Sequence, residues 1–499
     1  MTALTAKLTT WWRSREDDLG DVWPFMLVAN VLYLFLLGNA PLWYDEANSA
    51  WFAELPLTRM IAGIAGDTHP PLYYLLLVPI VKVFGPSTVA LRLPSVLFAM
   101  LTLYIVRQIA RELHLSRTAQ AIALGLMVLS PFQLHFAQEA RMYALFQVLV
   151  LGATLAALRK QMLRFVLLSA LSLWTHNYGL VFWAVNCGVL AWVVWQTKPR
   201  MNIFETGLIV SVVGGAAVAL WLPWAWVLAL QMRTVAGGYW IQPVTPGGLV
   251  YALNNIMYAF TLPPFLAPMG FVVSVGLLTW LMIKTMRTRV PEALLLAWMV
   301  IAPALLAVIV SIVWRPIFLF RGLAPGVPAL FLLAGWAFAQ LTRARQLYAA
   351  LLIVPLFVAA IVGQYLWVPD QKGARDNQLL ADIRAQWQEG DLIVHPNGNE
   401  LVGWHPVGAD LPQVTLPRHL CPPDVGGVSE ATFNAYGIQA VDPETLSWRR
   451  VWFIDLVFPM ITQCEVDMSQ AFLSAHPHRL AFSVEHSQFM DFDVWLVTR

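Results

Sequence analysis

The chain has 499 residues, of which 59% are hydrophobic and 12% are charged. A soluble globular protein carries about 25% charged residues, so this composition excludes that class and indicates an integral membrane protein. The formal net charge is only +2, and no basic block interleaved with aromatic residues occurs, which excludes a nucleic acid as a partner.

The N-terminal segment carries three basic residues, Lys7, Arg13 and Arg15, ahead of the first apolar run. That run has no small-residue cleavage site. We therefore interpret it as a retained membrane span and not as a removed signal peptide.

Eleven apolar runs meet or approach the roughly 17 to 25 residues that a transmembrane helix needs. The predicted spans are 22–40, 89–109, 119–136, 142–158, 161–177, 178–196, 203–222, 266–284, 291–313, 322–341 and 346–367. If the N-terminus is cytoplasmic, sixteen Lys and Arg residues lie on the cytoplasmic side of the membrane region and seven on the other side. The positive-inside rule supports this orientation, which places the C-terminal segment outside the cytoplasm.

This topology predicts a long first external loop at about 41–88 and a shorter one near 223–265. The first loop contains HPPLYYLLLVPIVKVF, which is apolar but interrupted by Pro79 and Lys82. Such a segment is expected to form a helix that lies at the membrane interface or re-enters it.

After residue 368, charged residues, Pro and Gly return, and short β-type runs appear. The predicted strands are 391–395, 450–458, 479–484 and 492–497, and a helix is predicted at 373–388. The chain therefore divides into a transmembrane part, 1–368, and a small extracytoplasmic α/β domain, 369–499.

Three cysteines are present. Cys187 lies in an apolar run, whereas Cys421 and Cys464 lie in the C-terminal segment. Those two form either a disulfide, which requires an oxidising compartment, or two free buried thiols. No Cys/His cluster with the spacing of a metal site occurs.

Two adjacent carboxylates, Asp45 and Glu46, follow the first span in PLWYDEANSAW. A carboxylate partly shielded from water has a raised pKa and can act as the general base for a hydroxyl nucleophile. The alternative is a solvated pair of loop acids. The neighbouring aromatic rings suit a sugar-binding cleft or, equally, a membrane-interface belt.

Further candidates lie at the predicted external ends of spans. His69 precedes two prolines and is either functional or a turn residue. Glu139, Arg141 and Tyr143 lie in FAQEARMYAL, where charges at membrane depth are either functional or paired with each other. His135 and Glu139 share a helical face, but two ligands do not make a metal site.

Four cations near apolar runs are candidates to bind a phosphate, or else they extend to lipid headgroups. They are Lys82, Arg92, Arg315 and Arg321. No Walker loop, GxGxxG, GxSxG or HExxH motif occurs in a meaningful context, so neither nucleotide hydrolysis nor a Ser or zinc hydrolase is supported.

Several segments together carry a resemblance to a known family. They are LWYDEANSAW, THPPLYYLLL, ALRLPSVLFAM, SPFQLHFAQEARMYAL, LSLWTHNYGL and FRGLAPGVPALFLLAGW. In this order they resemble bacterial polytopic glycosyltransferases related to the protein O-mannosyltransferases and the lipid A aminoarabinose transferases, which have the GT-C fold. The resemblance covers roughly 20–345 and leaves 369–499 unmatched.

The resemblance implies an inverting glycosyltransferase of the bacterial cytoplasmic membrane that uses a polyprenyl-phosphate sugar on the extracytoplasmic face. Asp45 would be the catalytic base, with Glu46 beside it. Arg321, Arg141 and Lys82, in that order, are the candidates for the phosphate. The other residues expected to contact substrate are His69, Tyr73, Arg92, Glu139, Tyr143, His176 and Arg315.

No cofactor is assigned, because members of the family differ in whether a divalent ion assists. The acceptor is a glycan, a lipid or a protein, and the C-terminal domain is expected to bind it or to cover the cavity. One alternative is a glycan ligase or polymerase that uses a diphosphate-linked carrier. Another is a lipid or sugar transporter, which would bury polar residues in mid-span.

Overall fold

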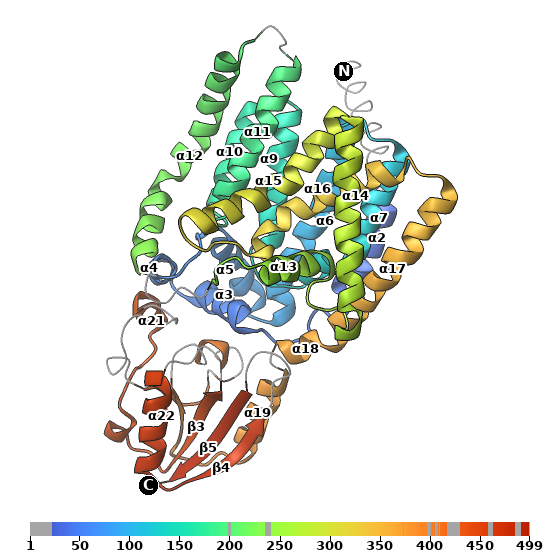
Figure 1. The fold of residues 1–499 in the computed structure, drawn as a ribbon. Helices are drawn as coiled ribbons and strands as arrows, with labels where there is room; N and C mark the ends of the chain where they lie inside the picture. Colours follow the sequence, from blue (N-terminus) through green and yellow to red (C-terminus); the bar gives the residue numbers. More distant parts are fainter. Residues whose placement is uncertain are drawn as a thin grey trace, which may run out of the picture. The chain divides into compact units, whose positions relative to one another are not determined.

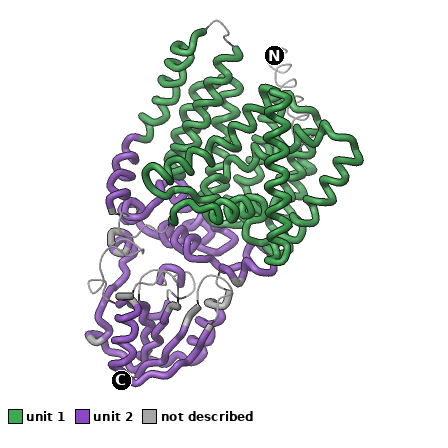
Figure 2. The backbone as a smooth tube through the Cα atoms, viewed as in Figure 1, with its two compact units in different colours: residues 1–35, 93–221, 241–364 green, residues 36–92, 222–240, 365–499 purple. Residues whose placement is uncertain are grey.

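The computed structural model describes residues 22–197, 201–234, 241–372, 374–396, 401–404, 408, 410–416, 430–457, 463–484 and 491–498. They form two compact units (Figure 2). Unit 1 comprises the described residues of 1–35, 93–221 and 241–364, and unit 2 those of 36–92, 222–240 and 365–499. Unit 2 therefore combines the first loop with the C-terminal segment.

Unit 1 is helical (Figure 1). Its helices are α2 (Trp23–Leu34), α6 (Thr88–Glu112), α7 (Arg117–Leu129), α8 (Pro131–Ala137), α9 (Tyr143–Leu158), α10 (Met162–Leu173), α11 (Gly179–Thr197), α12 (Ile203–Thr234), α13 (Pro246–Tyr258), α14 (Ala267–Thr288), α15 (Pro291–Val313), α16 (Val327–Phe338) and α17 (Arg343–Leu366), with 3-10 turns η1 (Pro264–Leu266) and η2 (Phe320–Gly326). Helices α6, α12 and α17 each continue into unit 2.

Each predicted span coincides with a helix, which confirms the polytopic helical membrane architecture. Within the described residues, seven helices are long and apolar enough to cross a membrane, and the pair α7 and α8 makes an eighth. Helices α2, α9 and α10 are 12, 16 and 12 residues long. At 1.5 Å per residue they are shorter than the roughly 30 Å hydrocarbon core, so the predicted count of eleven spans is approximate.

The bend between α7 and α8 is 57° and has a local cause. Ser130 precedes Pro131, and the proline ring disfavours a helical conformation at the residue before it. Ser130 is accordingly extended, and its side chain accepts a hydrogen bond from the Gln133 N–H as the N-cap of α8.

Unit 2 contains helices from the first loop and from the C-terminal segment. They are α3 (Tyr44–Glu54), α4 (Leu57–Gly66), α5 (Leu72–Phe84), α18 (Val368–Gln371), α19 (Ala374–Ala385), α21 (Glu430–Tyr436) and α22 (Gln463–Ala475), with the 3-10 turn η4 (Pro443–Thr445). Helix α5 is the predicted apolar helix of the first loop.

Five strands form one sheet in the order β2-β1-β3-β5-β4. They are β1 (Asp391–His395), β2 (Gln413–Thr415), β3 (Arg450–Val457), β4 (His478–Val484) and β5 (Asp491–Thr498). Strand β1 is parallel to β2 and β3, and β5 is antiparallel to β3 and β4. Each of the four predicted strands is present.

Alternation of side chains gives this sheet a core on each face. Ile393 and Trp452 pack with α19 on one face, whereas Val394 and Phe453 pack with α22 on the other. Figure 1 shows the two helices flanking the sheet. The α/β character predicted for the C-terminal segment is therefore confirmed. The question of a Cys421–Cys464 pairing falls on side chains outside the described residues.

Two titratable groups in β1 make this sheet sensitive to acid. Burial alone would raise the pKa of Asp391, but hydrogen bonds from Arg450 and Trp452 outweigh it, so the pKa is lowered. Burial lowers the pKa of His395 to about 4, although its hydrogen bond with Gln413 acts in the opposite direction. The unfolded chain therefore binds more protons in acid than the folded sheet does.

We expect the stabilisation of the sheet to be complete above pH 6.5, the ordinary histidine pKa, and to be lost as the pH falls toward about 4. The check is the proteinase K sensitivity of the C-terminal segment in the full-length protein between pH 7 and pH 4. The variant His395→Asn should show a weaker pH dependence. An identical pH profile in this variant would contradict the assignment.

Candidate active site

The acidic pair lies in the first turn of α3. Carboxylates are favoured there because the N-terminal end of a helix carries a partial positive charge. Consecutive residues of a helix point about 100° apart, and the two side chains differ accordingly. Glu46 is fully buried, whereas Asp45 is half-buried. The structure thus distinguishes two residues that the sequence presents as equivalent.

Glu46 accepts three charge-assisted hydrogen bonds. Arg92 donates from Nε to Oε1 at 2.8 Å and from Nη2 to Oε2 at 2.7 Å. Lys372, from the C-terminal segment, donates from Nζ to Oε2 at 2.9 Å. A buried carboxylate is tolerated only when it is paired in this way. Glu46 is therefore held as an anion within a fixed set of partners.

Arg92, in the second turn of α6, uses all five of its N–H groups. Besides the two bonds to Glu46, Nη1 donates to the carbonyls of Leu37 and Ala40 at 2.9 and 2.8 Å, and Nη2 donates to the carbonyl of Pro41 at 2.7 Å. A guanidinium has no further donor. This single side chain therefore fixes the whole segment from the first apolar run to the acidic pair.

The other candidates in unit 2 lie in the segment of α5. His69 Nδ1 lies 3.0 Å from Thr68 Oγ1 and 3.9 Å from Asp67 Oδ2, the two neighbours expected for a turn residue. Tyr73 is buried near the start of α5, and Lys82 is exposed at its end. These two are roughly 14 Å apart along the helix axis.

In unit 1, Glu139 belongs to a buried polar network. Its Oε2 lies 3.7 Å from His135 Nε2, and its backbone carbonyl accepts from Ser95 Oγ at 2.6 Å. His135 Nδ1 lies 3.0 Å from Gln364 Oε1. Gln364 in turn donates to Gln138 Oε1 at 3.4 Å, which joins α17 to the break after α8. No local sequence pattern marks either glutamine as part of a site.

Arg141, Tyr143 and His176 are all buried. Arg141 lies in the non-helical break between α8 and α9, and Tyr143 begins α9. The rings of Tyr143 and His176 are 5.8 Å apart, and His176 Nδ1 accepts a hydrogen bond from the Tyr178 N–H at 3.0 Å. The structure therefore brings two of the predicted substrate-binding side chains together.

Arg315 begins an extended strap, residues 315–319, between α15 and η2, and Arg321 lies in η2 directly after it. Ser311 Oγ accepts from the N–H groups of Ile317 and Phe318, both at 2.9 Å. The Tyr178 hydroxyl donates to the Ile317 carbonyl at 2.6 Å and accepts from the Leu319 N–H at 2.8 Å. Two hydroxyl groups thus fix the strap, which contains Arg315 and leads directly into the turn of Arg321.

Only one local feature of the sequence points to the contact between Tyr178 and the segment of these arginines. A Cβ atom on Gly322 would stand 2.7 Å from the ring of Tyr178. Only glycine therefore allows η2 to approach this ring so closely, and the glycine in FRGLAPG is the one local signal of the contact.

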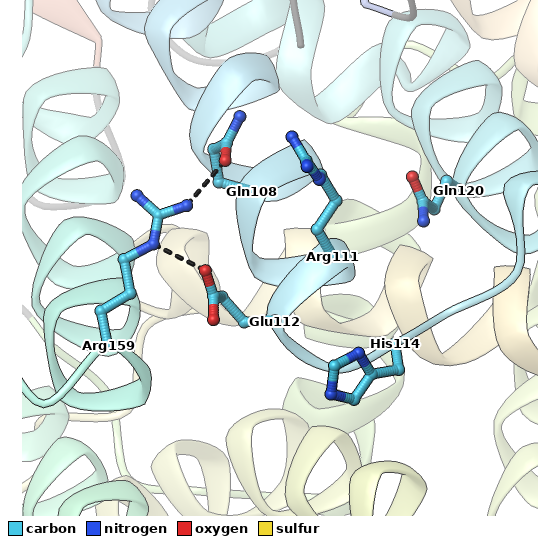
Figure 3. Close-up of a pocket in the computed structure, with 6 residues that line it drawn as sticks. All are labelled: Gln108, Arg111, Glu112, His114, Gln120 and Arg159. Carbon is cyan, nitrogen blue, oxygen red and sulfur yellow. Dashed lines mark hydrogen bonds and ion pairs between the residues drawn. The ribbon is translucent and has the colours of Figure 1, made fainter. Parts of the chain in front are cut away.

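A hollow of about 430 Å³ lies at the C-terminal end of α6. Figure 3 shows its lining residues, Gln108, Arg111, Glu112, His114, Gln120 and Arg159. Arg159 donates to Glu112 and to Gln108, each at 2.7 Å. The sequence assigns its arginines to the cytoplasmic side. Arg92 lies 20 residues before Glu112 on the same helix, which corresponds to a rise of roughly 30 Å along α6.

Among the residues that the structure describes, no three His, Cys, Asp or Glu side chains lie close enough to hold a metal ion. The pair of His135 and Glu139 supplies two ligands, fewer than the three protein ligands of catalytic zinc sites.

These helices and the small sheet form the GT-C fold of polytopic membrane glycosyltransferases, as the sequence resemblance implied. The fold is shared with ArnT from Cupriavidus metallidurans. The structure of ArnT in the apo state matches with a TM-score of 0.60 and 15% sequence identity over 95% of this chain and 98% of that chain. The structure of ArnT bound to undecaprenyl phosphate matches with a TM-score of 0.57 and 16% identity over the same shares.

No family model and no curated protein matches the chain. The likeness to ArnT is therefore a likeness of fold. It extends over the C-terminal segment, which the sequence resemblance did not reach.

We expect Arg92→Met to destabilise the protein by about 3 to 5 kcal/mol, because it leaves a buried carboxylate and three carbonyls with fewer donors. Arg92→Lys should not restore stability, since a lysine has three donors at one point instead of five in a fork. The matched control is Arg159→Met, whose ion pair with Glu112 is one-third exposed and should cost less than about 1 kcal/mol. The apparent melting temperatures of the two Met variants in detergent measure these losses of stability. Equal decreases in Arg92→Met and Arg159→Met would contradict the prediction.

We expect Tyr178→Phe to loosen the strap, because the Leu319 N–H loses its acceptor and the Ile317 carbonyl its donor, at a cost of about 1 to 3 kcal/mol. Hydrogen exchange of peptides covering residues 315–321 should become faster. Tyr348→Phe, at a tyrosine that is 70% exposed, serves as the control. Unchanged exchange in Tyr178→Phe would show that the strap is held in another way.

Proposed function

We propose that the protein is an inverting membrane glycosyltransferase that moves a sugar from a polyprenyl-phosphate donor to a hydroxyl acceptor on the extracytoplasmic face of the bacterial cytoplasmic membrane. The fold supports this proposal, and so does the binding of undecaprenyl phosphate by the ArnT structure that shares the fold. The carrier of the donor sugar would then be a lipid of this chemical class.

The observation that carries the proposal is the difference between the two adjacent carboxylates. Glu46 is buried and accepts bonds from Arg92 and Lys372, whereas Asp45 is half-buried at the start of the same helix. A general base needs a fixed backbone and a side chain within reach of the substrate. We therefore assign the catalytic step to Asp45 and the anchoring of the helix to Glu46.

In the proposed step, Asp45 accepts the proton of the acceptor hydroxyl as the hydroxyl oxygen attacks the anomeric carbon of the sugar. The new glycosidic bond forms on the face opposite the departing group, so the configuration inverts. The bond between the anomeric carbon and the phosphate oxygen breaks, and polyprenyl phosphate leaves with the electron pair. No acid is required, because a phosphate monoester is a good leaving group.

Cations that stabilise the charge of the departing phosphate would promote this step. We assign this role to Arg321, Arg141 and Lys82, in that order. Arg92 is better suited to a structural role, because its five N–H groups are donated within the loop. The strap held by Tyr178 would keep Arg315 and Arg321 in place as the charge develops.

We expect Asp45→Asn to lower kcat for sugar transfer by about 10²- to 10⁴-fold, the usual contribution of a general base, while donor binding remains. The assay presents radiolabelled polyprenyl-phosphate sugars to the purified protein in lipid, with a membrane extract as acceptor. Glu54→Gln is the control, since Glu54 is an exposed carboxylate at the other end of α3.

Transfer by Asp45→Asn at the rate of the wild-type protein would overturn the catalytic assignment. Transfer only from a diphosphate-linked carrier would instead support a glycan ligase. A transporter would move the labelled lipid across the bilayer without forming a glycosidic bond.

A further inference from the structure

The C-terminal segment contacts the acidic loop at three separate points of unit 2. Lys372 reaches Glu46, Tyr436 reaches α3, and Thr432 reaches α4. The sequence suggests a separate domain that binds acceptor or covers a cavity. The contacts suggest instead that this segment is part of the support of the acidic loop itself.

The first contact is the buried ion pair of Lys372 with Glu46. Lys372 is 6% exposed and directly follows the short helix α18, where its N–H donates to the Val368 carbonyl at 2.9 Å. The Lys372 ammonium is thereby placed 2.9 Å from Glu46 Oε2, the oxygen that also accepts from Arg92 Nη2. Glu46 is the neighbour of Asp45, so Lys372 acts on the turn that holds the proposed base.

The second contact lies one turn further along α3. The ring of Tyr436 stacks on Trp51, with ring centroids 4.1 Å apart and planes inclined by 13°. Its hydroxyl donates to the side-chain oxygen of Asn48, and all three side chains are buried. An aromatic stack with a buried hydrogen bond fixes both the position and the rotation of a helix.

The third contact joins α21 to α4. Thr432 Oγ1 donates to the Gly63 carbonyl at 3.0 Å. A Cβ atom on Gly63 would stand 2.8 Å from the Cβ of Ala435, so the two helices approach closely only because residue 63 is glycine. Helix α21 ends at Gly437, which adopts the left-handed conformation with φ of 73°.

We propose that Lys372 and Tyr436 are positioning residues for Asp45, so that the C-terminal segment contributes to the transfer step. This inference rests on the proposed function. Misplacement of a reacting group by about 1 Å costs on the order of 100-fold in rate, and Lys372 restrains the turn that carries Asp45. Loss of either contact lowers kcat and leaves the binding of the lipid donor unchanged.

The test compares full-length variants in lipid. Lys372→Met should lower kcat at least tenfold with an unchanged Kd for polyprenyl phosphate, and Lys372→Arg should recover most of the rate. Tyr436→Phe removes the hydroxyl but keeps the stack on Trp51 and should give a smaller loss. The matched control is Arg384→Met, which breaks the exposed pair with Asp410 in the same segment and should leave kcat unchanged.

A double variant tests whether Lys372 acts through Glu46. In the Glu46→Gln background, Lys372→Met should cause little further loss, because the two residues act as one unit. If the double variant instead loses kcat by the product of the two single losses, the proposal is overturned. So would a change confined to the KM of the acceptor, which would indicate an acceptor-binding role.

Hydrogen exchange of peptides covering residues 43–54 gives a readout that needs no reaction. Lys372→Met and Tyr436→Phe should accelerate exchange there, and Arg384→Met should not. Unchanged exchange in the first two variants would overturn the positioning role. If the wild-type protein transfers no sugar while exchange responds as expected, the proposed function fails and the contact between segment and loop stands.

Discussion

The buried ion pair of Glu46 with Arg92 is the interaction on which the architecture of the acidic loop depends. A charge removed from water is tolerated only with full hydrogen bonding, and Arg92 meets this demand by donating all five N–H groups. The acceptors include three backbone carbonyls, those of Leu37, Ala40 and Pro41, so this segment cannot move without breaking one of these bonds. The backbone of the half-buried Asp45 shares this constraint, because Glu46 is its neighbour in α3.

Buried polar side chains play a comparable part within unit 1. Most of its helix surfaces are apolar, and apolar surfaces give little directional preference in a bilayer. The contacts of His135 with Gln364, and of Tyr178 with the strap, are directional. They fix helix ends and irregular segments where the candidate Glu139, Arg315 and Arg321 lie. These polar contacts of unit 1 thus support segments that carry residues of the proposed chemistry.

The sequence predicts the periodic features well, because hydropathy and alternation are local. Each of the eleven apolar runs is helical, although 119–136 is divided between α7 and α8, and strand β1 has the predicted bounds, 391–395. The sequence does not predict structural features that depend on residues far away in the chain. Lys372 lies 326 residues from Glu46, so no local pattern shows which of two adjacent acids is buried. Strand β2 has only three residues, too few for alternation to be detected.

The composition of unit 2 also has a consequence for biosynthesis. Arg92 is translated soon after Glu46, so the first ion pair can form while the chain is still short. Lys372 follows about 280 residues later, which at 5 to 20 residues per second is a delay of roughly 15 to 55 s. During this interval the loop lacks all three contacts with the C-terminal segment, those of Lys372, Thr432 and Tyr436. A nascent or prematurely terminated chain would therefore insert into the membrane with an incomplete loop until Lys372, Thr432 and Tyr436 have been translated.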